Sequence, residues 1–177
     1  MKLKDLEKEY DKLQEKYGAE ELTSIYNGGC SENPDICFIF MNPTGRNIAS
    51  SKTWTVDFSK KVYENVTKHK YFITNLGKCT QVDARVIPNS VYKEFLELLK
   101  KEIEIINPKV IILFGNQVSS IVLNEKISVS TCRKKEFVQN IAGKDYKFYA
   151  IYYPVGNGRF NIDKSIEDIK YIQEQVL

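Results

Sequence analysis

Three short apolar runs constrain the fold of this chain more than any other sequence feature. They occupy residues 36–41, 71–74 and 110–114 and contain no charged residue. Apolar runs of this length, without alternating polar residues, are typical of β-strands that are buried on both faces. Stretches with apolar residues at helical spacing separate them, and this alternation predicts a mostly parallel sheet covered by helices.

The expected helices are defined by apolar residues three or four positions apart. They cover residues 2–17, 58–66, 91–103, 118–122 and 162–176. Two further extended segments, residues 135–140 and 146–152, flank Gly143. We therefore predict one domain over residues 1–177, an α/β fold built as a three-layer α/β/α sandwich around a central, mostly parallel four-stranded sheet.

The composition is ordinary for a globular domain. Apolar residues make up 42% and charged residues 28% of the 177 residues. No apolar run approaches the roughly 18–20 residues that a membrane span needs. The first residues, Met1 to Asp5, lack the apolar segment of a signal peptide. We expect a monomeric cytoplasmic protein with no membrane partner.

The four cysteines do not have the spacing of metal ligands. Cys30, Cys37, Cys79 and Cys132 are scattered without a CxxC pair, and the single histidine, His69, lies between two lysines. A zinc site needs closer ligand spacing, and disulfides are rare in cytoplasmic proteins. We predict free thiols and no metal.

The net charge is only +3, but the basic residues are clustered. Clusters occur at residues 60–61, 68–70 and 133–135. Such patches are compatible with a phosphate-backbone partner, although charge runs are more often solvated faces of a protein.

Each expected strand that leads to a helix ends in a polar or Gly/Pro turn. These turns are Asn42-Pro43-Thr44-Gly45, Asn75-Leu76-Gly77-Lys78, Gly115-Asn116 and Tyr153-Pro154-Val155. In open parallel sheets, ligands bind outside the carboxyl ends of the strands. The sequence therefore predicts a site where the four turns converge.

The same four segments resemble motifs of the uracil-DNA glycosylase superfamily. Residues 40–45 are similar to its first motif, in the Asn-Pro form of the mismatch-specific branch. Residues 71–79 and 107–115 resemble segments of the bacterial and archaeal iron–sulfur branch, and residues 149–154 take the place of the closing His-Pro-Ser motif. The resemblance covers about residues 24–160. It implies a DNA glycosylase that hydrolyses the N-glycosidic bond of uracil or another deaminated or damaged base, with DNA as its partner.

The resemblance also implies which residues would bind the base. Asn42 matches the residue that holds the attacking water, and Asn75 matches the asparagine that recognises the pyrimidine edge. Trp54 lies where the superfamily keeps an aromatic residue that stacks on the extruded base. Met41 and Pro43, on either side of Asn42, are further base-binding candidates.

Catalysis and DNA binding involve a second set of candidates. Tyr153, through its hydroxyl or its backbone N–H, is the expected hydrogen-bond donor to the departing base. The expected contacts to the DNA strand are Arg46, Lys52, Lys78 and Arg159.

The chain departs from the superfamily pattern at two places. Tyr153 and Val155 stand where the closing motif has histidine and serine. Cys79 matches one iron–sulfur ligand, but no CxxC pair precedes it and no cysteine follows at the fourth ligand position. We therefore predict no cluster and no other cofactor. Because an asparagine at position 42 positions water without being a strong base, slow catalysis is expected.

Each assignment has a simpler structural alternative. Asn42 before Pro43 could be a turn residue, and Asn75 could cap the segment that follows it. Trp54 and Tyr153 could be packing residues, and the four basic residues could be surface charges. The four turns support the site together more strongly than any one of them does alone.

Two other functions also fit the sequence. The replacement of histidine by Tyr153 is compatible with a catalytically weak or inactive nucleic-acid-binding homologue that kept the pocket. The modest net charge is compatible with a nucleotide- or nucleoside-processing enzyme on the same scaffold. Base release from a uracil-containing strand argues against the first, and strong salt-dependent DNA affinity argues against the second.

Overall fold

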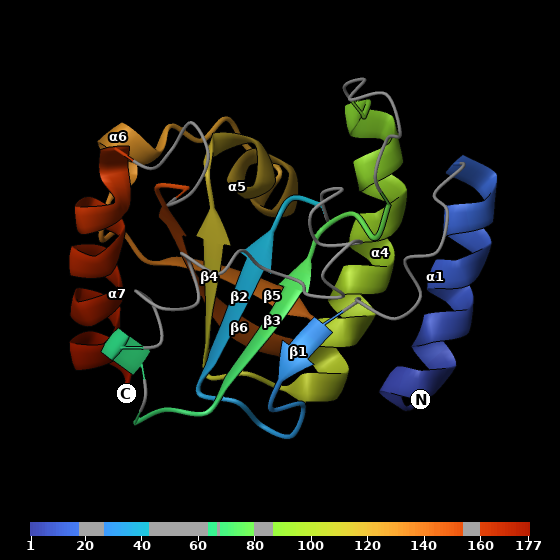
Figure 1. The fold of residues 1–177 in the computed structure, drawn as a ribbon, viewed down its shortest axis with the longest axis horizontal. Helices are drawn as coiled ribbons and strands as arrows, with labels where there is room; N and C mark the ends of the chain where they lie inside the picture. Colours follow the sequence, from blue (N-terminus) through green and yellow to red (C-terminus); the bar gives the residue numbers. More distant parts are fainter. Residues whose placement is uncertain (18–26, 43–63, 67, 80–86, 154–159) are drawn as a thin grey trace.

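A computed structural model of the protein describes residues 1–17, 27–42, 64–66, 68–79, 87–153 and 160–177. In these residues six strands form one sheet in the order β1-β3-β2-β4-β6-β5 (Figure 1). The four central strands run parallel, and each edge strand is antiparallel to its neighbour. The strands are β1 (Asn27–Gly29), β2 (Ile36–Phe40), β3 (Tyr71–Asn75), β4 (Val110–Phe114), β5 (Phe137–Ile141) and β6 (Lys144–Ile151).

The helices complete the three layers that the sequence predicts. One face of the sheet is covered by α7, and the other is covered mainly by α4, with α1 packed against α4 (Figure 1). The described helices are α1 (Leu3–Tyr17), α4 (Asn89–Ile106), α5 (Asn116–Leu123), α6 (Val129–Cys132) and α7 (Ile162–Val176). Among these, none is long and apolar enough to cross a membrane. The helix predicted over residues 58–66 lies almost entirely outside the described residues.

Burial on both faces explains why the strand sequences are continuously apolar. In β2, Cys37 and Ile39 belong to the core under α1 and α4, whereas Ile36, Phe38 and Phe40 belong to the core under α7. Successive side chains of a strand point to opposite faces, and here both faces exclude water. All five residues of β2 are at most 4% exposed.

The predicted sheet is confirmed and extended by the structure. The four parallel strands are those expected from the sequence, and the segments around Gly143 form the β5–β6 hairpin. The unexpected strand is β1, Asn27–Gly29, which pairs antiparallel with β3. Its sequence carries no apolar pattern, so nothing in it predicted a strand.

A buried ion pair joins α1 and α4 to the end of β3. Lys78 Nζ lies 3.1 Å from Glu102 Oε2, and both side chains are at most 1% exposed. Tyr10 and Thr74 each donate a hydroxyl hydrogen bond to this carboxylate, at 2.6 and 2.7 Å. Gln14 Nε2 donates to the Lys78 carbonyl at 2.6 Å. Every oxygen of the buried carboxylate is therefore hydrogen-bonded, and the turn after β3 is fixed to both helices.

Candidate functional site

The turns that follow β2 and β3 lie side by side at the carboxyl edge of the sheet. Phe40, the last residue of β2, is opposite Asn75, the last residue of β3. Backbone hydrogen bonds continue beyond the strands, from Leu76 N–H to the Phe40 carbonyl and from Gly77 N–H to the Met41 carbonyl, both at 2.7 Å. The two turns therefore keep the register of the strands that precede them.

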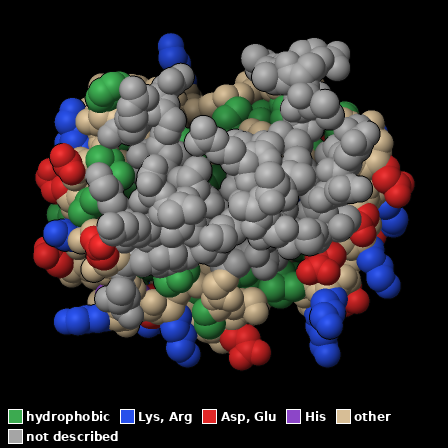
Figure 2. Space-filling model, viewed as in Figure 1, with side chains coloured by type: hydrophobic (Ala, Val, Ile, Leu, Met, Phe, Trp, Pro, Cys, Tyr) green, Lys and Arg blue, Asp and Glu red, His purple; other side chains and the backbone are tan. Residues whose placement is uncertain are grey.

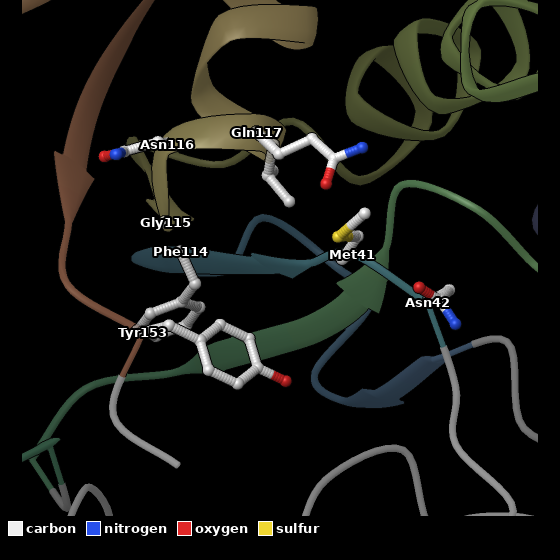
Figure 3. A pocket seen from close by; sticks show the side chains of 8 residues that line it. Met41, Asn42, Phe114, Gly115, Asn116, Gln117 and Tyr153 are labelled. Carbon is white, nitrogen blue, oxygen red and sulfur yellow. The ribbon is translucent and has the colours of Figure 1, made fainter. Parts of the chain in front are cut away.

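A pocket of about 300 Å³ opens at this edge of the sheet (Figure 3). Met41 and Asn42 contribute from the turn after β2, and Tyr153 contributes from the segment after β6. The end of β4 and the first turn of α5, residues 114–118, complete the lining. Three of the four predicted strand-end turns thus meet in one cavity.

Gly115 allows α5 to begin directly after β4. Its φ of 88° and ψ of 168° fall in a region that only glycine adopts without strain. A Cβ on this residue would lie 3.8 Å from Tyr153 Cβ, which is an ordinary contact, so backbone conformation rather than space demands glycine here. The sharp turn brings the first residues of α5 into the pocket wall.

Three aromatic rings pack together at the pocket, and two of them, Phe114 and Tyr153, line it. The Phe40 and Phe114 rings are stacked with centroids 4.5 Å apart, and the Tyr153 ring meets them edge-on at 5.8 and 6.4 Å. Figure 3 shows the Tyr153 ring extending toward the side of the pocket formed by Met41 and Asn42. Burial raises the pKa of Tyr153, so its hydroxyl remains a hydrogen-bond donor at neutral pH.

Asn42 is held by a tyrosine from α4. The Tyr92 hydroxyl donates to Asn42 Oδ1 at 2.9 Å. The Tyr92 side chain is 1% exposed, and its ring lies so close to Gly77 that a Cβ there would be 2.8 Å from Tyr92 Cε1. Burial raises the pKa of Tyr92 far above its ordinary value, which keeps the hydroxyl protonated as the donor.

Asn75 is buried without satisfying its amide group. The residue is 1% exposed, and within the described part of the chain neither Nδ2 nor Oδ1 has a hydrogen-bond partner. Leaving a buried polar group unpaired costs about 1–3 kcal/mol. Such a group calls for an explanation, such as a catalytic or ligand-binding role or a bound water. Since both atoms are shielded from solvent, a ligand reaches them only through local opening of the structure.

The structure places only some of the predicted site residues together. Met41, Asn42 and Tyr153 line the pocket. Asn75 does not line it but lies beside Phe40, whose ring packs against two pocket residues. The predicted residues that lie outside the described part of the chain are Pro43, Trp54, Arg46, Lys52 and Arg159.

The prediction that Lys78 contacts DNA is wrong. Its side chain is fully buried and forms the ion pair with Glu102. Its ammonium also donates to Thr74 Oγ1 at 2.6 Å and to the Asn75 carbonyl. Burial lowers the pKa of Lys78, although the Glu102 carboxylate opposes this shift. Lys78 therefore has a structural role, because it supports the turn that begins at Asn75.

The basic clusters at residues 68–70 and 133–135 do not gather at this pocket, and residues 60–61 lie outside the described part of the chain. Arg133 bonds the buried carboxylate of Asp168 with two nitrogens, both at 2.9 Å, and Lys134 pairs with Glu167. The 68–70 cluster precedes β3 and so lies at the opposite, amino end of the strands. Around the described rim of the face in Figure 2, basic and acidic side chains are interspersed.

Two residues of interest at this end of the molecule were not predicted from the sequence. Tyr92 belongs to the apolar face of α4. Its place in the helical spacing of apolar residues predicts only that it is part of the core. Phe160 is 80% exposed and lies just before α7, whose first turn is at the same end of the molecule as the carboxyl ends of the strands (Figure 1). What distinguishes Phe160 is its exposure, and exposure cannot be read from a sequence, so nothing in the sequence marked this residue.

The described residues contain no candidate metal site. Their His, Cys, Asp and Glu side chains form no group of three or more that could hold an ion. Burial raises the pKa of Cys79 to about 11, so this cysteine is a neutral thiol. The absence of an iron–sulfur cluster stays a prediction from the ligand spacing.

A three-layer fold with a pocket at the carboxyl ends of parallel strands defines a class of α/β proteins that bind ligands at this edge. Within that class, the model of the uracil DNA glycosylase superfamily matches residues 28–172, so the chain belongs to this superfamily. The match confirms the superfamily indicated by the four strand-end motifs. The resemblance to its two branches stays a prediction. A search of curated proteins found no match.

Proposed function

We propose that the protein is a DNA glycosylase that removes uracil, or another deaminated base with a similar edge, from DNA. The observation that carries this proposal is the buried amide of Asn75, which has no hydrogen-bond partner among the residues that the structure describes. This amide supplies one donor and one acceptor at the end of β3, next to the pocket. Because the chain belongs to the uracil DNA glycosylase superfamily, this pocket is the candidate base-binding site.

The amide of Asn75 complements one edge of uracil. Uracil offers an acceptor at O4 and a donor at N3–H, side by side. An asparagine amide offers a donor at Nδ2 and an acceptor at Oδ1, so both bonds form together. A carboxylate at the same place would only accept. Hypoxanthine, with a carbonyl next to an N–H, presents a similar pair of groups.

Binding of an extruded base requires a flat apolar surface in the pocket. A base must leave the duplex stack before an enzyme reaches its glycosidic bond, and extrusion costs a few kcal/mol. Stacking of a base on an aromatic side chain returns roughly 1–3 kcal/mol. Phe40 and Phe114 are at most 4% exposed, so they support the Tyr153 ring in the pocket wall and do not offer a stacking face themselves. Trp54 is the proposed stacking residue.

Asn42 and Tyr153 supply the polar groups for bond cleavage. As the glycosidic bond breaks, positive charge develops on the sugar and negative charge on the departing base. The Tyr153 hydroxyl, kept protonated by its raised pKa, would donate to O2 of the base as that charge develops. Asn42 would position the attacking water. Since an amide is not a strong base, the rate should be low for this kind of enzyme.

The test is base release from matched single- and double-stranded oligonucleotides that each carry one uracil. We expect alkali-sensitive cleavage by the parent protein, and a loss of about 100-fold or more in Asn42→Ala and Asn75→Ala. Strands that carry hypoxanthine or a mismatched thymine define the range of bases. A folded parent protein that releases none of these bases but binds the uracil strand tightly would favour the inactive binding homologue instead.

Phe160 provides a separate prediction on DNA affinity. Phe160 is an exposed aromatic residue just before α7, and the first turn of that helix lies at the site end of the molecule (Figure 1). It is therefore suited to stack on a base or to enter between base steps. Phe160→Ala should weaken binding to a uracil-containing duplex by about five- to 150-fold, the range that corresponds to roughly 1–3 kcal/mol. Fluorescence anisotropy at fixed salt measures this affinity. The matched control is Val138→Ala, an exposed apolar residue on β5, and equal affinities in the two variants would rule out the role of Phe160.

A further inference from the structure

Helix α4 carries two side chains that reach two different strand-end turns. Tyr92, near its beginning, bonds the side chain of Asn42 in the turn after β2. Glu102, ten residues later and thus about 15 Å further along the helix axis, bonds Lys78 and Thr74 at the end of β3. One rigid helix therefore fixes both the turn that begins near Asn42 and the turn that begins at Asn75.

The environment of Tyr92 leaves its hydroxyl little freedom. Its ring is buried against Gly77, where even a methyl group would be too close at 2.8 Å. Gly77 is itself fixed by the hydrogen bond from its N–H to the Met41 carbonyl, one residue before Asn42. The ring, the Gly77 backbone and Asn42 thus form one packed unit.

We propose that Tyr92 is the positioning residue for Asn42, which makes it a further determinant of the reaction. The two amide atoms of asparagine have nearly the same shape, so a 180° rotation exchanges the donor and the acceptor. In this structure the Tyr92 hydroxyl donates to Oδ1 and so holds the amide with its oxygen toward α4. Tyr92 acts through Asn42 and does not touch the base or the sugar. Its catalytic consequence rests on the proposed glycosylase function.

The first test is the single-turnover rate of Tyr92→Phe on a uracil-containing duplex. We expect the rate to fall about tenfold, as for the loss of one neutral hydrogen bond in the transition state. Affinity for a duplex with 2′-fluorodeoxyuridine, whose fluorine slows cleavage by destabilising positive charge on the sugar, should stay within twofold. In an Asn42→Ala background, Tyr92→Phe should cause no further loss, because the residue through which it acts is absent.

Two variants separate positioning from general loss of structure. Tyr149→Phe removes another part-buried tyrosine hydroxyl, which bonds Glu136 at 3.0 Å, and should keep the parent rate within twofold. Gly77→Ala adds a methyl group against the Tyr92 ring without removing a polar atom, and should slow the reaction as Tyr92→Phe does. If the two substitutions act on the same contact, their effects will not add in the double variant. A parent-like rate in folded Tyr92→Phe overturns the inference.

A second readout does not depend on turnover. The side-chain amide signals of Asn42 in a ¹H–¹⁵N NMR spectrum, assigned by their loss in Asn42→Ala, should shift in Tyr92→Phe and stay unchanged in Tyr149→Phe. If the parent protein releases no base but these signals shift, the proposed function fails while the positioning contact stands. Unchanged Asn42 signals in Tyr92→Phe overturn the inference whatever the activity.

Discussion

Replacing Asn75 by leucine is expected to stabilise the folded protein by about 1–3 kcal/mol and to abolish base release. Leucine has nearly the shape of asparagine but carries no polar atoms, so it removes the cost of burying an amide that has no partner in the described part of the chain. The same change removes both hydrogen bonds to the base. A site built to hydrogen-bond a substrate rejects an analogue that lacks the bonded group by about 10⁴-fold or more, and we expect a loss of rate of similar size when the protein's side of the pair is removed. Urea unfolding and single-turnover kinetics on a uracil-containing duplex measure the two effects.

The neighbouring residue provides the control for this prediction. Thr74 is equally buried, but its hydroxyl donates to Glu102 and accepts from Lys78. Thr74→Val should therefore destabilise the protein by about 1–3 kcal/mol. If Asn75→Leu also destabilises the protein, its amide has a structural partner, and the main support for the proposed site is lost.

Lys78→Met is expected to lower the free energy of unfolding by about 3–5 kcal/mol, because it leaves the Glu102 carboxylate buried without its cation. Changing Glu102 to glutamine in the same chain removes the uncompensated charge and should recover more than half of the loss. The double variant also provides a folded protein for comparison if Lys78→Met alone does not fold. Chemical denaturation of the parent and both variants measures these differences.

The same variants test the structural role of Lys78 against a role in DNA binding. A lysine on a phosphate contributes about one unit to the slope of log affinity against log salt. Since Lys78 is 0% exposed, the double variant should keep the parent slope. A slope lower by about one unit, together with unchanged stability in Lys78→Met, would restore the DNA contact first expected from the sequence.

The fold was largely predictable because its central strands are buried on both faces. That burial produces the uninterrupted apolar runs of β2 and β4, and helical spacing marks the covering helices. Strand β1 was not predictable, because Asn27–Gly29 joins β3 through backbone hydrogen bonds rather than apolar side chains. A pattern of side chains cannot indicate an element that depends on the backbone.

The place of the site was predictable, but the partners of its residues were not. Parallel strands direct their carboxyl ends to one edge, and this rule brought Asn42 and Tyr153 to the same pocket. Lys78 was assigned to DNA because the sequence around a lysine in a turn does not show that it is buried. Its ion-pair partner, Glu102, lies 24 residues away on α4. Tyr92 was missed for the same reason, since only the tertiary structure brings its hydroxyl to Asn42.

Helix α1 lies outside the residues that match the superfamily but contacts the buried ion pair behind the site. The match begins at residue 28, yet Tyr10 and Gln14 of α1 bond Glu102 and the Lys78 carbonyl. The helix therefore does more than cover apolar surface. It completes the buried network that supports the turn beginning at Asn75.

The most direct test of the central claim follows the side-chain amide of Asn75 while the protein binds DNA. Its ¹H–¹⁵N signals, assigned by their loss in Asn75→Leu, are recorded with a duplex that carries 2′-fluorodeoxyuridine. A duplex with a tetrahydrofuran abasic analogue at the same position is the control. We predict that saturation with the first duplex shifts the Asn75 amide protons downfield, as new hydrogen bonds require, and that the control leaves them in place. If the fluorinated duplex binds to saturation and the Asn75 signals do not change, the Asn75 amide does not bind the base, and the central claim is contradicted.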